Sequence, residues 1–112
     1  MQHIVRVLAP LSAAVALLWS PPTLAATFEE QIALGRASLR RARNLGDAAA
    51  LDLARQSFLD ATATAPARVL GHYYVALADW ELALSARAAG SADRVVELSR
   101  EGVQHCTLLL EL

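Results

Sequence analysis

The sequence predicts an all-α domain of four antiparallel helices. Ala and Leu dominate the 112 residues and aromatic residues make up 5%, a composition that favours helices over strands. Four stretches repeat apolar residues at helical spacing. The breaks between them are only three to five residues long, so consecutive helices are expected to pack antiparallel. The length suits one small domain.

Residues 1–25 precede this domain and are predicted to be a secretory signal peptide. Arg6 lies near the amino terminus, residues 7–19 carry no charge, and Ser20-Pro21-Pro22 ends the apolar run. Thr23 and Ala25 are small residues at the −3 and −1 positions of cleavage after Ala25. A membrane anchor is the alternative, but thirteen helical residues span about 20 Å of a bilayer core of about 30 Å. We therefore expect a periplasmic or secreted domain of residues 26–112.

The first helix is expected over about residues 28–43. Thr27 and Glu30 have capping-box spacing, and Gly46 can end the helix in a left-handed conformation. Its apolar residues recur at steps of four and three and predict one buried face: Phe28, Ile32, Gly35, Leu39 and Ala42.

Three further helices follow at about residues 48–64, 68–87 and 92–112. Asp47 and Ser91 are expected to cap the second and fourth helices, and Pro66 follows the second. The inner face of the second helix is expected to consist of Leu51, Ala54, Phe58 and Ala61.

The second helix resembles the second half of a tetratricopeptide repeat. That family spaces a small residue, an aromatic residue, a small residue and a proline as Ala54, Phe58, Ala61 and Pro66 are spaced here. In the fourth helix, Gly102, Cys106 and Leu109 resemble the three packing positions, and Leu34-Gly35 and Val75-Ala76 resemble the pair that marks the first helix of a repeat.

The resemblance implies two degenerate repeats, at about residues 28–66 and 69–112. Both hairpins are longer than the 34-residue family unit, by about seven and about fourteen residues. Asp79 stands where the family usually has an aromatic residue. An unrelated four-helix bundle is the alternative fold.

Tetratricopeptide proteins bind peptides in a groove lined by the first helix of each pair, so the resemblance implies a protein-binding groove here. The alternative places Tyr73 and Trp80 in the core, without a groove. Carried over by position, the lining residues are Glu29, Ile32, Arg36, Leu39 and Arg40 from the first helix, and Leu70, Tyr73, Leu77, Trp80 and Glu81 from the third.

Few residues suggest catalysis or metal binding. His105 and Cys106 are adjacent on a helix and diverge by about 100°, and Cys106 is expected to be a buried packing residue. His72 can approach His105, but two histidines alone make a weak metal site. Asp79 and Glu81 are expected to be solvated acids beside a packed Trp80.

The basic residues are all arginines. The absence of Lys excludes a Walker lysine and a Schiff-base lysine, and the net charge of −1 gives no indication of nucleic-acid binding. The patch formed by Arg36, Arg40, Arg41 and Arg43 is interpreted as a solvated face, with an acidic peptide or polyanion as the alternative.

These observations predict an exported protein–protein interaction module of the cell envelope, without a catalytic, cofactor or metal site. The partner is expected to be a protein or peptide in the envelope. One alternative is a structural bundle that associates with itself through Leu108–Leu112, and another is an N-terminal fragment of a longer repeat protein. An envelope hydrolase or metal carrier, which would depend on the His and Cys residues, is the least favoured.

Overall fold

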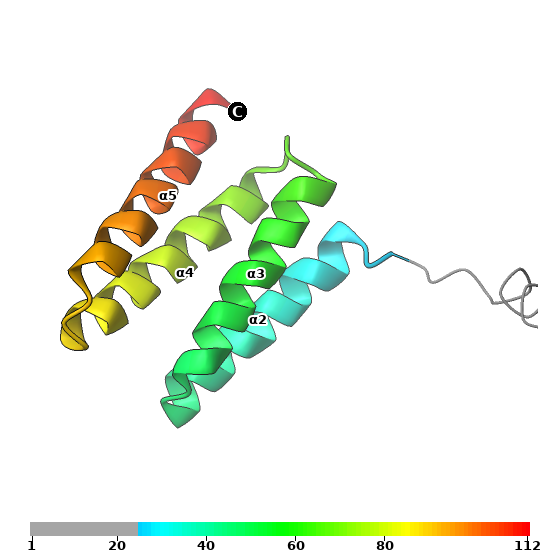
Figure 1. Cartoon of the computed structure of the whole chain (residues 1–112). Helices are drawn as coiled ribbons and strands as arrows, with labels where there is room; N and C mark the ends of the chain where they lie inside the picture. The colour runs from blue at the N-terminus through cyan, green and yellow to red at the C-terminus, as the bar shows by residue number, and fades with distance from the viewer. Residues whose placement is uncertain (1–24) are drawn as a thin grey trace, which may run out of the picture.

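A computed structural model describes residues 25–112, and all four predicted helices are present there (Figure 1). They are α2 (Phe28–Leu45), α3 (Ala48–Thr64), α4 (Val69–Ala88) and α5 (Ala92–Glu111). The described part contains no strand, which confirms the all-α prediction. The first 24 residues of the predicted signal peptide lie outside the described residues.

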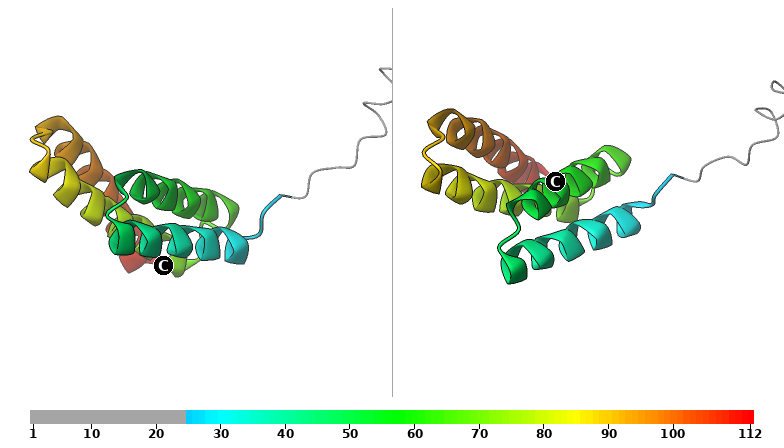
Figure 2. Two further views of the ribbon diagram at one scale, coloured as in Figure 1. Left: turned by 90° about the horizontal axis from the view of Figure 1, so that it is seen from below. Right: turned by 60° about the horizontal axis from the view of Figure 1, so that its bottom comes forward.

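Each helix packs mainly against its neighbours in the chain, so α2–α3 and α4–α5 are antiparallel hairpins joined by the contact of α3 with α4. The first helix of each hairpin, α2 or α4, lies on one side of the domain, and α3 and α5 lie on the other (Figure 2). The four helices follow one another across the domain, and α2 and α5 are the outermost two (Figure 1). This arrangement is compatible with a helical repeat.

The first two helices begin at side-chain caps, as predicted. Thr27 Oγ1 accepts a hydrogen bond from the Glu30 backbone N–H at 3.1 Å, and Asp47 Oδ1 accepts one from the Ala50 N–H at 3.3 Å. Both bonds satisfy backbone donors that have no partner inside the helix.

Glycines with positive φ shape the turns of both hairpins. Gly46 ends α2 at φ 64°, as predicted, and Gly90 has φ 75° between α4 and α5. Ser91 occupies the N-cap position of α5, but its side chain makes no capping hydrogen bond. The prediction of a Ser91 cap is therefore right in position and wrong in mechanism.

The first hairpin encloses the core around Phe58, which is fully buried. The Phe58 ring stacks on Tyr74 of α4 at 4.8 Å between centroids. It also packs directly on Gly35, where an added Cβ would lie less than 3.0 Å from three ring atoms. The whole predicted face of α2 is buried, as are Ala54 and Ala61 of α3, while Leu51 is half-buried.

The second hairpin is buried much less. Leu98 is the only buried residue of α5. Cys106 is exposed, so its predicted burial is wrong, while Gly102 and Leu109 are half-buried. The reason is that no helix of the described chain covers the outer side of α5, whereas α4 covers the equivalent side of α3.

Candidate binding surfaces

A hollow of about 270 Å³ lies between α2 and α4, on the side formed by the first helix of each hairpin. The burial of Leu39 and the partial burial of Leu77 give the hollow an apolar floor. Half of the predicted groove residues are in its wall. The lining consists of Arg36, Leu39, Arg40, Arg43, Tyr73, Tyr74 and Leu77.

The other predicted groove residues have different positions. Ile32 is buried in the core, and Glu29 lies exposed at the start of α2, where Arg68 Nη1 donates to its Oε1 at 2.6 Å. Leu70 is exposed near the start of α4. Glu81 lies at the opposite end of the groove, and its Oε1 accepts a hydrogen bond from Arg43 Nε at 2.8 Å.

Trp80 does not line this hollow, although it belongs to the same helix as Tyr73. Its side chain lines a second hollow between α4 and α5. Trp80 is 62% exposed and Tyr73 is 49% exposed. The alternative in which both are core residues is therefore wrong.

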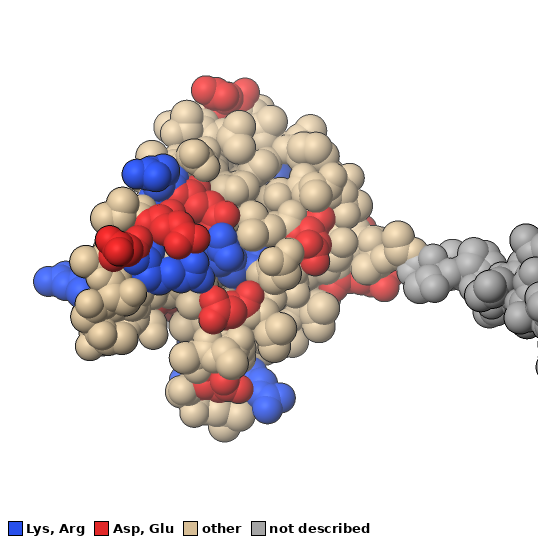
Figure 3. Space-filling model, in the orientation of Figure 1, with Lys and Arg blue, Asp and Glu red and all other residues tan. Residues whose placement is uncertain are grey.

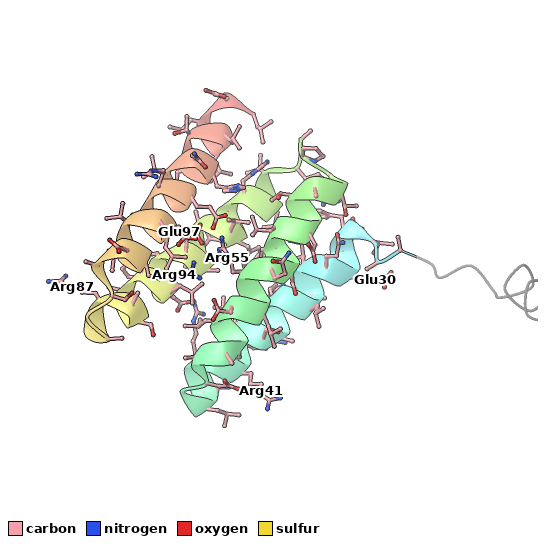
Figure 4. All side chains as sticks on the ribbon, viewed as in Figure 1. Glu30, Arg41, Arg55, Arg87, Arg94 and Glu97 are labelled. Atoms are coloured by element: carbon pink, nitrogen blue, oxygen red, sulfur yellow. The ribbon has the colours of Figure 1, made fainter. Side chains whose placement is uncertain are left out.

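The arginines of α2 divide between two faces. Arg43 is held by Glu81, and hydrogen bonding to that carboxylate raises the arginine's pKa. Arg36 and Arg40 line the hollow and make no ion pair with the described residues. Arg41 points away from the groove (Figure 4) and lies 3.5 Å from Asp47. Two arginines of the predicted patch thus line this hollow without an acidic partner among the described residues.

The hollow between α4 and α5 measures about 350 Å³ and is mostly apolar. Small residues from both helices form much of it, and Trp80 and Val103 stand exposed at its sides. Asp79 contributes the single carboxyl group of the lining. The lining residues are Ala76, Asp79, Trp80, Ala83, Leu98, Ser99, Gly102, Val103 and Cys106.

Below this hollow, a largely buried ion cluster joins α3, α4 and α5. Arg55 of α3 donates two hydrogen bonds to Glu101 of α5, from Nε at 2.6 Å and from Nη2 at 3.0 Å. Its Nε also donates to Asp79 Oδ1 at 3.1 Å. Charged side chains gather where these helices meet (Figure 3), and Arg55 lies between the helices (Figure 4).

Asp79 is 1% exposed and Trp80 is 62% exposed. The prediction that Asp79 is a solvated acid beside a packed Trp80 is therefore wrong. Burial, together with the nearby Glu101 carboxylate, raises the pKa of Asp79 to about 8 against the opposing effect of Arg55. Burial also acts to raise the pKa of Glu101, but hydrogen bonds from Arg55 and Asp79 lower it below its usual value. At neutral pH the pair therefore holds one proton, on Asp79.

Sequence reasoning missed Arg55 and Glu101 as a unit with Asp79. The available signal was an acid at the usual aromatic position of a packing face, together with Arg55 directly after the packing residue Ala54. Arg55 donates to both Glu101 oxygens, so the cluster holds three helices together.

The two histidines do meet. The Nδ1 atoms of His72 and His105 are 2.8 Å apart, and His72 Nε2 is 2.7 Å from the Pro66 carbonyl oxygen. His72 Nε2 donates to that carbonyl, and in the neutral His72 ring Nδ1 then accepts a hydrogen bond from His105 Nδ1–H. Burial and His72 lower the pKa of His105. Within residues 25–112, no group of three or more His, Cys, Asp or Glu residues is arranged to hold a metal ion.

Comparisons with known proteins gave no match to a family model, a curated protein or a solved structure. Among the described helices, none combines the length and hydropathy required to cross a bilayer. The geometry of the two hollows is thus the basis for a functional proposal.

Proposed function

We propose that this chain is an exported tetratricopeptide-like interaction module that binds an acidic peptide segment of a partner protein between α2 and α4. The observation that carries the proposal is the presence of Arg36 and Arg40, which no acid of the described chain pairs, beside the half-exposed Tyr73 in that hollow. The repeat-like spacing of Ala54, Phe58, Ala61 and Pro66 supports the assignment to this type of module.

The lining suits a segment that alternates acidic and apolar side chains. Guanidinium groups form charge-assisted hydrogen bonds with carboxylates. Tyrosine offers a large contact area with a polar end, and aromatic anchors often dominate interface energy. The hollow between these groups, with Leu39 and Leu77 at its base, has room for one apolar side chain. Affinity is expected to fall as salt rises, because the arginines are at the surface.

The cellular setting of the proposal rests on residues 1–25. Their charge, apolar run and small residues before the cleavage point have the order of a secretory signal. Cleavage after Ala25 would release a periplasmic or secreted domain only two residues before α2 begins at Phe28. The expected partner is therefore a protein or peptide of the cell envelope.

In-cell photocrosslinking tests the proposal. A photoreactive phenylalanine analogue replaces Tyr73 in the groove or, as a control, Leu53, which is exposed on α3. We expect a defined adduct from position 73 and none from position 53. A synthetic peptide of the acidic segment of the captured protein should then bind the purified domain.

Charge variants make the test specific. Arg36→Gln with Arg40→Gln should weaken binding of that peptide at least about tenfold. Arg87→Gln with Arg100→Gln is the matched control, because it removes two exposed arginines outside the groove. Equal binding by the two double variants, or a captured segment without acidic residues, would contradict the proposal.

A further inference from the structure

The outer side of α5 carries a stripe of residues with coiled-coil spacing. Val96, Ser99, Val103, Cys106 and Leu110 follow one another at steps of three and four, the spacing that keeps residues on one seam of a helix. All five are exposed, and Leu110 is the most exposed large apolar residue of the described chain. None is charged. A helix in a monomer does not require such a stripe on its solvent side.

The stripe runs along the hollow between α4 and α5. Ser99, Val103 and Cys106 belong to the stripe and also line the hollow. When the packing positions of α5 are aligned with those of α3, Cys106 corresponds to Phe58, which is fully buried under α4. The second hairpin therefore presents the face that another helix covers in the first hairpin.

We infer that the face formed by α5 and the hollow beside it binds a second copy of this chain, with the two α5 helices antiparallel across a two-fold axis near Val103.

The lack of charge in the stripe itself favours a second copy over a different protein. A two-fold axis brings a surface against an identical surface, so any charge at its centre meets its own kind. The stripe has none, and Asp79, below the hollow, has a pKa raised to about 8 by burial. The exposed Trp80 and Val103 lie beside the small residues Ala76, Ala83 and Gly102, so the face contains both protruding residues and space to receive them.

The sequence of the stripe is compatible with the antiparallel direction, and the helix dipoles favour it. Val96 and Leu110 lie seven residues before and after Val103, so antiparallel pairing places an aliphatic residue of one copy opposite an aliphatic residue of the other. The two helix dipoles are then opposed, which is favourable.

Head-to-tail contact of this face with α2 of another copy is disfavoured by charge. The exposed Leu34 lies four residues after Glu30 and seven residues before Arg41, so these three residues share one face of α2. A head-to-tail contact would place both charged side chains against the apolar stripe, where their desolvation costs free energy.

Sedimentation velocity of the purified chain tests the inference. At about 100 µM protein, a dimer with a Kd near 1 µM is almost fully formed, and we expect a mass of two copies. Val103→Arg places a charge at the two-fold axis and should raise the Kd at least about tenfold. Leu53→Arg on α3 is the matched control, because Leu53 is 63% exposed and Val103 is 65% exposed. It should leave the dimer intact.

A cysteine crosslink tests the direction of pairing without a destabilising substitution. In the antiparallel dimer Cys106 of one copy lies beside Ser99 of the other, while the two Cys106 residues are about 9 Å apart along the helices, too far for a disulfide. Ser99→Cys should therefore form a covalent dimer with oxidised glutathione, which takes up the two electrons and two protons as two glutathione thiols. The unchanged chain should not.

Four results would overturn the inference. One is a monomer at about 100 µM, and another is a dimer unaffected by Val103→Arg in a variant that retains its helical circular dichroism. The third is a disulfide between the two Cys106 residues of the unchanged chain, which would indicate parallel pairing. Species that grow with concentration beyond two copies would also overturn it and indicate head-to-tail assembly. Because α2 and α4 form the peptide groove, either proposal can fail without the other.

Discussion

The hairpin of α2 and α3 and the hairpin of α4 and α5 present comparable packing faces, but among the described helices only the first face is covered by another helix. Phe58 of α3 is fully buried against Tyr74 of α4, whereas Cys106, at the matching position of α5, is exposed. A packing pattern thus shows which side of a helix can be buried. Whether that side is buried depends on the presence of a neighbour.

The aligned pair Phe58 and Cys106 should give the greatest contrast in stability. Phe58→Ala should reduce the free energy of unfolding by about 3–5 kcal/mol, enough to unfold much of a domain of this size. Cys106→Ala in dilute protein should change it by less than about 0.5 kcal/mol, because the side chain is exposed. Chemical denaturation measures both. A large loss from Cys106→Ala would show that the two faces are equally buried.

Glycines in the two hairpins offer the next contrast. Gly35→Ala should cost about 1–3 kcal/mol, because the new Cβ would overlap the Phe58 ring. Gly102→Ala should stabilise the domain by about 0.4–1 kcal/mol, since its Cβ would lie 3.5 Å from Asp79 Cβ, an ordinary contact. Thermal and urea unfolding of both variants test this. The same sign for both changes would contradict the difference in packing.

The buried cluster between the hairpins predicts a dependence on pH. Asp79 keeps its proton in the folded state up to a pKa of about 8, while the unfolded carboxyl group releases it near pH 4. The folded state thus binds more protons over that range, so this contribution to stability falls as pH rises towards 8. We expect a loss on the order of 2 kcal/mol between about pH 5 and pH 8, measured by urea unfolding at each pH.

Asp79→Asn is the control for that slope. The amide has nearly the same shape, cannot ionise and can still donate to Glu101. Its unfolding free energy should lack the decrease towards pH 8. The lowered pKa of His105 acts in the other direction, reducing stability as pH falls through about 6.5. This effect is present in both the unchanged protein and the Asp79→Asn variant, so it cancels in their comparison. Identical pH profiles for the two chains would contradict a protonated Asp79.

Trp80 should contribute little to stability, in contrast to Leu39, its counterpart when Val75-Ala76 is aligned with Leu34-Gly35. Trp80→Ala should change the stability of dilute protein by less than about 1 kcal/mol, because most of the side chain is exposed. Leu39→Ala should cost about 2–5 kcal/mol. Circular dichroism during denaturation measures both. Unfolding caused by Trp80→Ala would show that Trp80 is part of the core.

Much of the fold could be predicted from local patterns. The buried face of α2 follows the helical spacing from Phe28 to Ala42. Thr27 accepts a hydrogen bond from a free backbone N–H at the start of the helix, and Gly46 adopts the left-handed conformation that ends it. The lining of the hollow between α2 and α4 could be predicted only in part. Arg36, Arg40 and Tyr73 line it, but Trp80 faces another hollow because α4 contacts different helices on its two sides.

The amino-acid sequence was sufficient to specify the four helices, most of their ends and the faces that can pack, because these depend on neighbours within a few residues. Packing between helices was needed to bury Asp79 with Arg55 and Glu101, to bring His72 to His105, and to leave Cys106 exposed. Each of these outcomes depends on distances between helices that are far apart in the chain. The physical reason is that burial and pKa depend on which groups surround a side chain, and spacing along one helix does not specify those groups.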